Sequence, residues 1–167
     1  MSYTLSVLLD DALLSLNRAV GVLRRRNLPI HSISVGPAQT PGVSRLTVML
    51  AVDDATADRL LQQMRKMVGV RQAVVFRRSE GVARELALIK VRASPGQYAE
   101  VLEVVALFKA SVADEGPDEI IVEVAGSDAF VVSLIRALEP YGIIDVARSG
   151  SVALERAGAG AGLLSPL

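Results

Sequence analysis

Residues 5–15, LSVLLDDALLS, decide the fold of the first part of the chain. The apolar run at 5–9 is typical of a buried strand, and a helical pattern follows directly. A strand-to-helix turn directs backbone N–H groups at whatever lies above it, so it is a natural place to hold a carboxylate. Such a site usually contains glycine, because only glycine lets a ligand approach the backbone closely. This turn has Leu14 in its middle and no glycine, which indicates a small-molecule sensor site whose sensing residues have changed.

Apolar spacing predicts the rest of the first half, working outward from this turn. A helix follows the turn and ends before Pro29, because the residue that precedes proline disfavours the helical region. Strands at 31–35 and 44–52 form a hairpin, and Ile33 and Val35 are the apolar residues of the first of them. Asp53 or Asp54 caps a second helix, and a strand at 70–76 closes the half.

The second half repeats this order of elements. Strands are predicted at 85–93, 111–114, 119–125 and 143–147, with one helix after the first strand and one after the third. Residues 151–154 either extend the last strand or pair beside it. The inference is an α+β chain of two ferredoxin-like βαββαβ domains, each with both helices on one face of an antiparallel sheet.

The polar, glycine-containing stretch after the first half marks the domain boundary. We expect a first domain at 1–77, a linker at 78–83, a second domain at 84–156 and a flexible tail at 157–167. Each sheet keeps one uncovered face and open edges, which are liabilities unless something covers them. We therefore expect a homodimer, with sheets or helices paired across a two-fold axis.

Composition limits the function classes. The chain has 167 residues, with 18 Lys and Arg against 18 Asp and Glu, and a neutral chain is a poor candidate for nucleic-acid binding. It has no cysteine, which excludes disulfides and thiolate metal sites. No apolar run approaches the roughly 20 residues that cross a membrane. With no visible signal peptide, a cytoplasmic location is expected.

The residues give no catalytic constellation. Asp10 and Asp11 lack a third group, and negative charge near a helix start is the better interpretation of the pair. His31 cannot form a His-rich metal site alone. Arg45 could hold an anion, although an arginine at a strand end more often pairs with a carboxylate. An enzyme that acts alone is therefore not expected.

Several segments resemble one family when taken together. They are LSVLL at 5–9, NR at 17–18, IHSISVGP at 30–37, SRLT at 44–47, RELALIKV at 84–91 and VARSG at 146–150. In order and spacing, to about Glu155, they are similar to the small regulatory subunit of acetolactate synthase (acetohydroxyacid synthase). The first domain resembles an ACT domain, a module that binds amino acids.

The resemblance implies a partner and a role. The family's small subunit has no active site and binds a large catalytic subunit that uses thiamine diphosphate, Mg²⁺ and FAD to join pyruvate to another 2-oxoacid. It raises the activity of that enzyme and usually confers feedback inhibition by valine or a related amino acid. The effector binds between paired ACT domains, where the first turn of one chain faces the start of the second strand of the other.

Carried onto this chain, the effector site comprises Asp11, Leu14, Ser15, Leu16, Pro29 and Ile30. Three of these depart from the family pattern: Asp11 and Pro29 stand where asparagine is usual, and Leu14 replaces the close-approach glycine. Asp11 adds negative charge where a carboxylate would dock, and the side chain of Pro29 neither donates nor accepts a hydrogen bond. Together the changes argue against valine binding of the usual kind.

Three hypotheses follow. The first is a regulatory subunit that activates a thiamine-dependent partner in branched-chain amino acid biosynthesis (valine, leucine and isoleucine), with weak or lost valine feedback. The second is a stand-alone amino-acid sensor for a different ligand, whose amino group Asp11 would bind. The third, a small ferredoxin-like enzyme, is the weakest, because the chain lacks a catalytic constellation.

Overall fold

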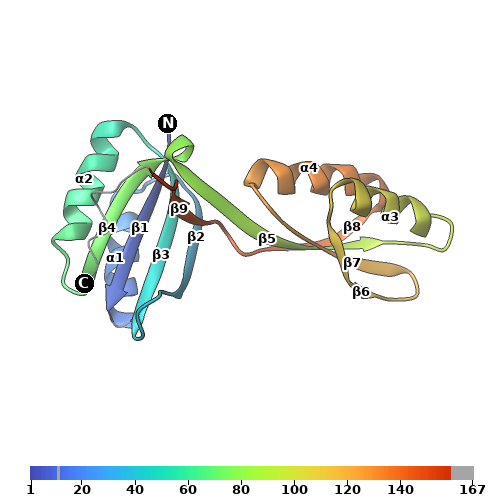
Figure 1. Cartoon of the computed structure of the whole chain (residues 1–167), viewed down its shortest axis with the longest axis horizontal. Coiled ribbons are helices and arrows are strands. Elements are labelled where there is room, and N and C mark those ends of the chain that lie inside the picture. The colour runs from blue at the N-terminus through green and yellow to red at the C-terminus, as the bar shows by residue number, and fades with distance from the viewer. Residues whose placement is uncertain (11, 159–167) are drawn as a thin grey trace. The chain divides into compact units, whose positions relative to one another are not determined.

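The computed structural model describes residues 1–10 and 12–158 (Figure 1). The chain forms two compact units. The first unit contains Met1–Ala83 together with the described residues from Ser151 onward, and the second contains Arg84–Gly150. This division differs from the expected one at the C-terminal end, because residues 151–156 belong to the first unit and not to the second. Residues 159–167 of the expected tail lie outside the described residues.

The first unit has the expected βαββαβ order. Its four strands form an antiparallel sheet in the order β2-β3-β1-β4. The elements are β1 (Ser2–Asp10), α1 (Ala12–Arg25), β2 (Ile30–Pro37), β3 (Val43–Ala51), α2 (Asp54–Arg65) and β4 (Val70–Arg77).

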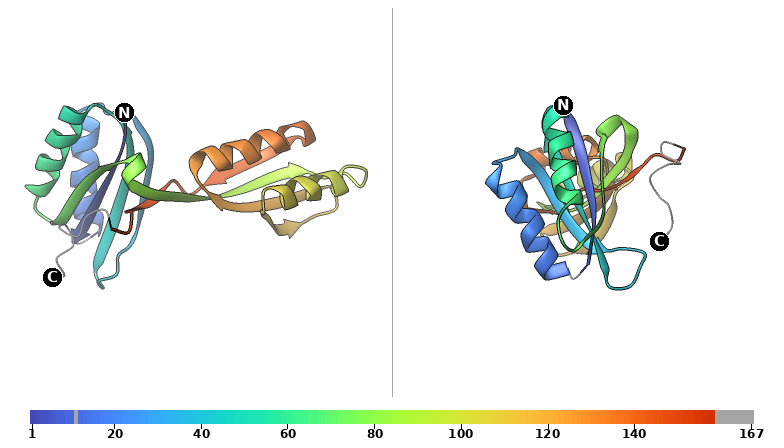
Figure 2. Two further views of the ribbon diagram at one scale, coloured as in Figure 1. Left: turned by 45° about the horizontal axis from the view of Figure 1, so that its top comes forward. Right: turned by 90° about the vertical axis from the view of Figure 1, so that its left-hand side faces the viewer.

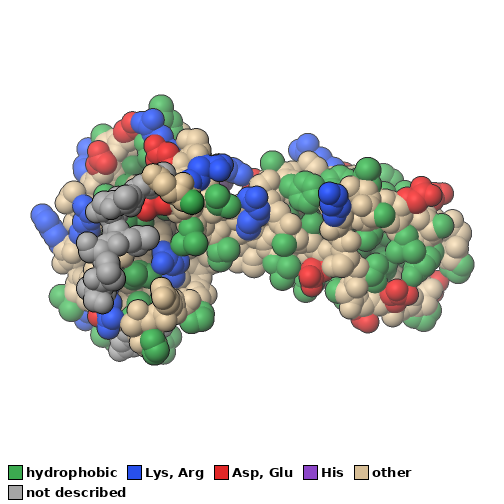
Figure 3. Space-filling view, viewed as in Figure 1, with side chains coloured by type: hydrophobic (Ala, Val, Ile, Leu, Met, Phe, Trp, Pro, Cys, Tyr) green, Lys and Arg blue, Asp and Glu red, His purple; other side chains and the backbone are tan. Residues whose placement is uncertain are grey.

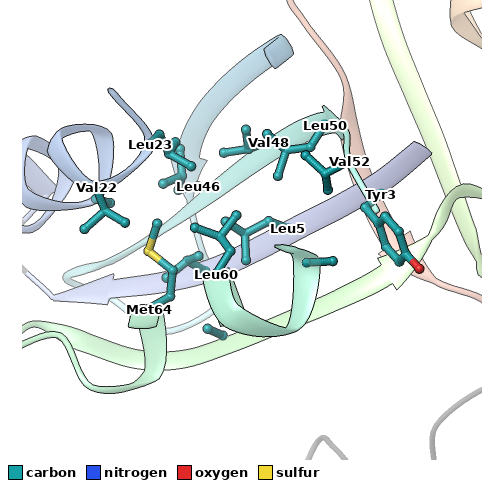
Figure 4. Close-up of a cluster of buried hydrophobic side chains, with 14 of the residues drawn as sticks. Tyr3, Leu5, Val22, Leu23, Leu46, Val48, Leu50, Val52, Leu60 and Met64 are labelled. Carbon is teal, nitrogen blue, oxygen red and sulfur yellow. The ribbon is translucent and has the colours of Figure 1, made fainter. Parts of the chain in front are cut away.

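The core of the first unit lies between the helices and one face of the sheet (Figure 4). Alternate residues of β1 and β3 point into it, because side chains alternate between the two faces of a strand. Leu60 and Met64 of α2 lie four residues apart on one helical face and are fully buried there. The sheet contributes Leu5, Val7, Leu9, Leu46, Val48 and Leu50, all fully buried.

The start of α2 settles which aspartate caps it. Asp53 has extended backbone, and its carboxylate accepts a hydrogen bond of 2.6 Å from the N–H of Thr56. Asp54 instead accepts a hydrogen bond of 2.7 Å from Arg77 at the end of β4. Hydrogen bonds from Tyr3 and Arg77 hold the pKa of Asp54 below its usual value.

The two apolar residues predicted for β2 lie on the core face of the sheet but are not buried. Ile33 and Val35 are 38% and 43% exposed, whereas Ser32 and Ser34 are half-buried on the other face. The register pairs Ile33 with Val48, so both lie on the helix side of the sheet. Because β2 is an edge strand, its helix-side residues reach beyond the core that α1 and α2 cover.

The C-terminal strand β9 (Val152–Glu155) neither extends β8 nor pairs beside it, contrary to both expected alternatives. It pairs with β5 (Gly81–Arg92), and the N–H of Arg156 donates to the carbonyl of Glu80 over 2.9 Å. The expected linker is a short 3-10 turn, η1 (Arg78–Glu80), followed by the first residues of β5. The right-hand view of Figure 2 shows the helices on one side of the first sheet and β9 on the other.

The second unit repeats the βαββαβ order, which confirms the predicted fold class. Its sheet runs β6-β7-β5-β8, and α3 and α4 pack on one face around Ile89, Val122 and Leu134. Its further elements are α3 (Tyr98–Leu107), β6 (Ser111–Glu115), β7 (Glu119–Gly126), α4 (Asp128–Leu138), η2 (Glu139–Tyr141) and β8 (Ile143–Arg148).

A buried ion pair joins the two strands of the second unit that carry the RELALIKV and VARSG segments. The carboxylate of Glu85, whose side chain is 4% exposed, pairs with Arg148, which also reaches Asp128 at the start of α4 over 2.7 Å. Burial lowers the pKa of Arg148, but its hydrogen bonds to Glu85 and Asp128 raise it by more. The hydroxyl of Ser149 accepts from the N–H of Leu86 over 3.0 Å and closes the same strand end.

Replacing Arg148 with Ala should destabilise the second unit by about 3 kcal/mol, because it leaves the Glu85 carboxylate buried without its cation. The control Asp128→Ala removes a half-exposed partner and should cost less than about 1 kcal/mol. Urea unfolding followed by circular dichroism measures both. Equal midpoints for Arg148→Ala and the wild-type chain would show that the pair does not stabilise the unit.

Candidate functional site

Residues at the start of β4 and in the loop before it hold the turn between β1 and α1 in place. The N–H of Asp10 donates to the carbonyl of Gly69 over 2.8 Å, and the Asp10 carboxylate pairs with Arg71 of β4. The charge of Asp10 is thus partly balanced within the first unit. The neighbouring Asp11, a predicted site residue, lies outside the described residues.

Ser15, another predicted site residue, supports the turn from inside. It is 3% exposed and faces the loop that joins α2 to β4. Gly69 in that loop has a φ of +89°, and a Cβ built on it would lie 2.0 Å from the Ser15 hydroxyl oxygen. Glycine is therefore required at 69, both for its backbone conformation and for its contact with Ser15.

The first turn of α1 presents leucine side chains at the surface. Leu14 is 56% exposed and Leu13 is 77% exposed, whereas Leu16 is half-buried and packs against the core. Val68, in the loop beside this turn, is 77% exposed, and its carbonyl accepts from Arg18 of α1 over 3.4 Å. The predicted effector turn therefore carries apolar side chains where a ligand would approach.

The other predicted wall lies at the far end of α1. The carbonyl of Pro29 accepts from the N–H of Ala51 over 3.1 Å, and Ile30 is half-buried against the core. The 14 residues of α1 separate this wall from the turn, a length of about 20 Å at 1.5 Å per residue. One chain therefore does not bring Leu14 and Pro29 together, and a site that uses both needs a second copy.

The described residues contain no group of three or more His, Cys, Asp or Glu side chains placed to hold a metal ion. His31 is exposed on the edge strand β2. None of the helices in the described part of the chain has the length and apolar character to span a membrane.

Family models match both parts of the chain. Residues 5–72 match the AHAS small subunit-like ACT domain, and residues 84–157 match the model of the small subunit of acetolactate synthase. The chain belongs to the acetolactate synthase small-subunit family. This confirms the resemblance and the expectation of an ACT domain at the N-terminus, and it supports a regulatory role for the chain.

Individual relatives cover nearly all of the chain. It is 37% identical over 161 residues to the acetolactate synthase small subunit of Mycobacterium bovis, with 96% of each chain covered. The small subunit of Bacillus subtilis is 38% identical over 142 residues, covering 84% of this chain and 83% of its own. The crystal structure of the small subunit from Thermotoga maritima superposes with a TM-score of 0.87 at 30% identity, covering 93% of this chain and 98% of its own.

Sequence reasoning missed Gly69 and the ion pair between Asp10 and Arg71, which support the turn together with Ser15. Gly69 lies in the turn between α2 and β4, and a single glycine in a turn is a usual sign of positive φ. The ion pair between Asp10 and Arg71 has no such local sign, because 61 residues separate its partners.

Replacing Gly69 with Ala should destabilise the first unit by about 2 kcal/mol, because alanine at positive φ is strained and its Cβ meets Ser15. The control Gly96→Ala changes a glycine whose Cβ would meet nothing within 4 Å and whose φ is not positive. Thermal unfolding of both variants by calorimetry tests this. A Gly69→Ala melting temperature equal to that of Gly96→Ala would contradict it.

Proposed function

We propose that this chain binds the large catalytic subunit of acetolactate synthase and raises its activity in branched-chain amino acid biosynthesis. The observation that carries the proposal is the full-length similarity to small subunits across both units. Thiamine diphosphate, Mg²⁺ and FAD would reside on the catalytic partner. Activation then requires that this chain bind the active conformation of its partner more tightly than the inactive one.

The edge strand β2 supports homodimerisation. Among the described residues no strand pairs with its outer edge, and Ile33 and Val35 lie exposed on it. Since β1 and β2 both run antiparallel to β3, the end of β2 lies at the same end of the sheet as the effector turn. Antiparallel pairing of two β2 strands would bring the Pro29–Ile30 wall of one copy to the Leu14 turn of the other.

Valine feedback is proposed to be weak or lost. A bound amino acid needs hydrogen-bond donors and acceptors for its charged groups, and burying those groups without partners is costly. Leu14 offers an apolar side chain at the turn, and Pro29 offers no side-chain hydrogen bond. The residue type of Asp11 adds a negative charge, which repels a carboxylate.

Mixing the chain with its catalytic subunit should raise turnover, and valine up to millimolar concentration should leave that turnover unchanged. The triple variant Asp11→Asn, Leu14→Gly, Pro29→Asn should make the complex valine-sensitive, because it restores amide groups and the close approach to the backbone. Steady-state assays with a valine titration measure both. No rise in turnover would contradict activation, and strong inhibition of the wild-type complex would contradict lost feedback.

Replacing Val35 with Lys should shift the chain from dimer to monomer, because it places a charge in the β2 interface. The control Leu107→Lys introduces the same charge on α3 of the second unit, at a side chain that is 78% exposed. Sedimentation velocity over a concentration series measures the dissociation constant. Equal dimerisation of both variants would place the interface elsewhere.

A further inference from the structure

One end of the strand face of the first unit remains half-exposed. Over the other end, Ala153 of β9 packs on Val74 and Phe76, and Ser34 donates to the carbonyl of Ser151 over 2.8 Å. The half-exposed end is a row of four residues that lie opposite one another on neighbouring strands: Gln72, Leu8, Arg45 and Gly36.

Arg45 is held against the sheet in this row. Its Nη1 donates to the hydroxyl of Ser6 over 2.7 Å, and Ser6 is 3% exposed. This hydrogen bond fixes the guanidinium without neutralising it. An arginine fixed in this way loses little side-chain entropy when it binds a carboxylate through its remaining N–H groups.

Within the described residues, Arg45 has no carboxylate partner. Arg77 pairs with Asp54 over 2.7 Å, and Arg148 pairs with Glu85. Arg59 and Arg65, like Arg45, instead donate to neutral oxygens. Space for a partner exists beside Arg45, since a Cβ built on Gly36 meets no atom within 4 Å. The sequence left two alternatives for Arg45, and the structure favours the anion-binding one.

We propose that Arg45 receives a carboxylate side chain of the catalytic subunit. The inference rests on the proposed function, which supplies that partner. Small ligands bind in concave pockets, whereas this row lies on an open sheet face that a protein surface fits better. Charge favours an acidic partner surface, because the guanidinium of Arg45 keeps its positive charge on this face and binds only a neutral hydroxyl. Figure 3 shows both basic and acidic side chains on the visible side of the first unit.

The variant Arg45→Gln tests the contact while keeping a donor for Ser6. The full-length variant should bind the catalytic subunit about tenfold more weakly than wild type, with most of the change in the dissociation rate. Arg59→Gln is the matched control, because Arg59 is exposed on α2, on the helix side of the sheet, and has the hydroxyl of Thr56 as its partner. Its affinity should equal that of wild type in surface plasmon resonance.

A second variant, Arg45→Met, separates charge from folding. Methionine keeps an apolar side chain of similar length and removes the hydrogen-bond donor. A melting temperature close to that of wild type, together with weaker binding to the catalytic subunit, would support the contact. If Arg45→Met is unstable, Arg45→Gln decides alone, and wild-type affinity in Arg45→Gln overturns the inference. Rising salt should weaken wild-type binding more than Arg45→Gln binding.

Two other partners for the row at Arg45 would each give a different experimental result. Loss of self-association in Arg45→Gln, without the catalytic subunit, would assign the row to a second copy and overturn the inference. Calorimetric binding of pyruvate to the isolated chain that depends on Arg45 would assign it to a free carboxylate and also overturn it. Failure of wild type to bind the catalytic subunit would instead refute the proposed function, so the two failures are distinguishable.

Discussion

Both helices of the first unit pack on one face of a four-stranded sheet. This placement determines which surfaces of the sheet are left for other contacts. Helices on one side leave the strand face and both edge strands for other partners. β9 returns to the first sheet and covers part of the strand face through Ala153. The β2 edge and the row at Arg45 are among the surfaces that remain, and they are the ones proposed for the second copy and for the catalytic subunit.

The turn proposed as the effector site is well supported from within, but its outer side chains depart from the expected pattern. Asp10, Ser15 and Gly69 hold the turn through a backbone hydrogen bond, a buried contact and a positive φ. Leu14 on the outer side of the same turn faces solvent. The groups that hold the turn are therefore separate from the side chain on its outer surface, so the proposed loss of feedback does not require loss of the turn. A retained scaffold with lost feedback is physically consistent for that reason.

Local periodicity predicted most of the fold, because strands and helices with one buried face carry that face in their sequence. It failed for β2, where Ile33 and Val35 alternate like core residues but lie beyond the helices at a sheet edge. It also failed for β9, because the sequence of this four-residue strand does not determine which strand it pairs with.

For the candidate site, too, the sequence identified some residues but not how they pair in space. The resemblance identified Leu14 and Pro29, which the structure places at opposite ends of α1. Glu85 and Arg148 belong to two separate motif segments, and the structure joins them as an ion pair across 63 residues of sequence. Such pairings depend on the sheet register, which composition and spacing along the chain do not determine.

We propose above all that this chain binds a thiamine diphosphate-dependent catalytic chain. Affinity purification of the full-length protein from its native cells, followed by mass spectrometry of the companion chains, tests this most directly. The account predicts one stoichiometric companion, a large acetolactate synthase subunit. Recovery of the chain alone, or with a stoichiometric companion of another enzyme class, would contradict it.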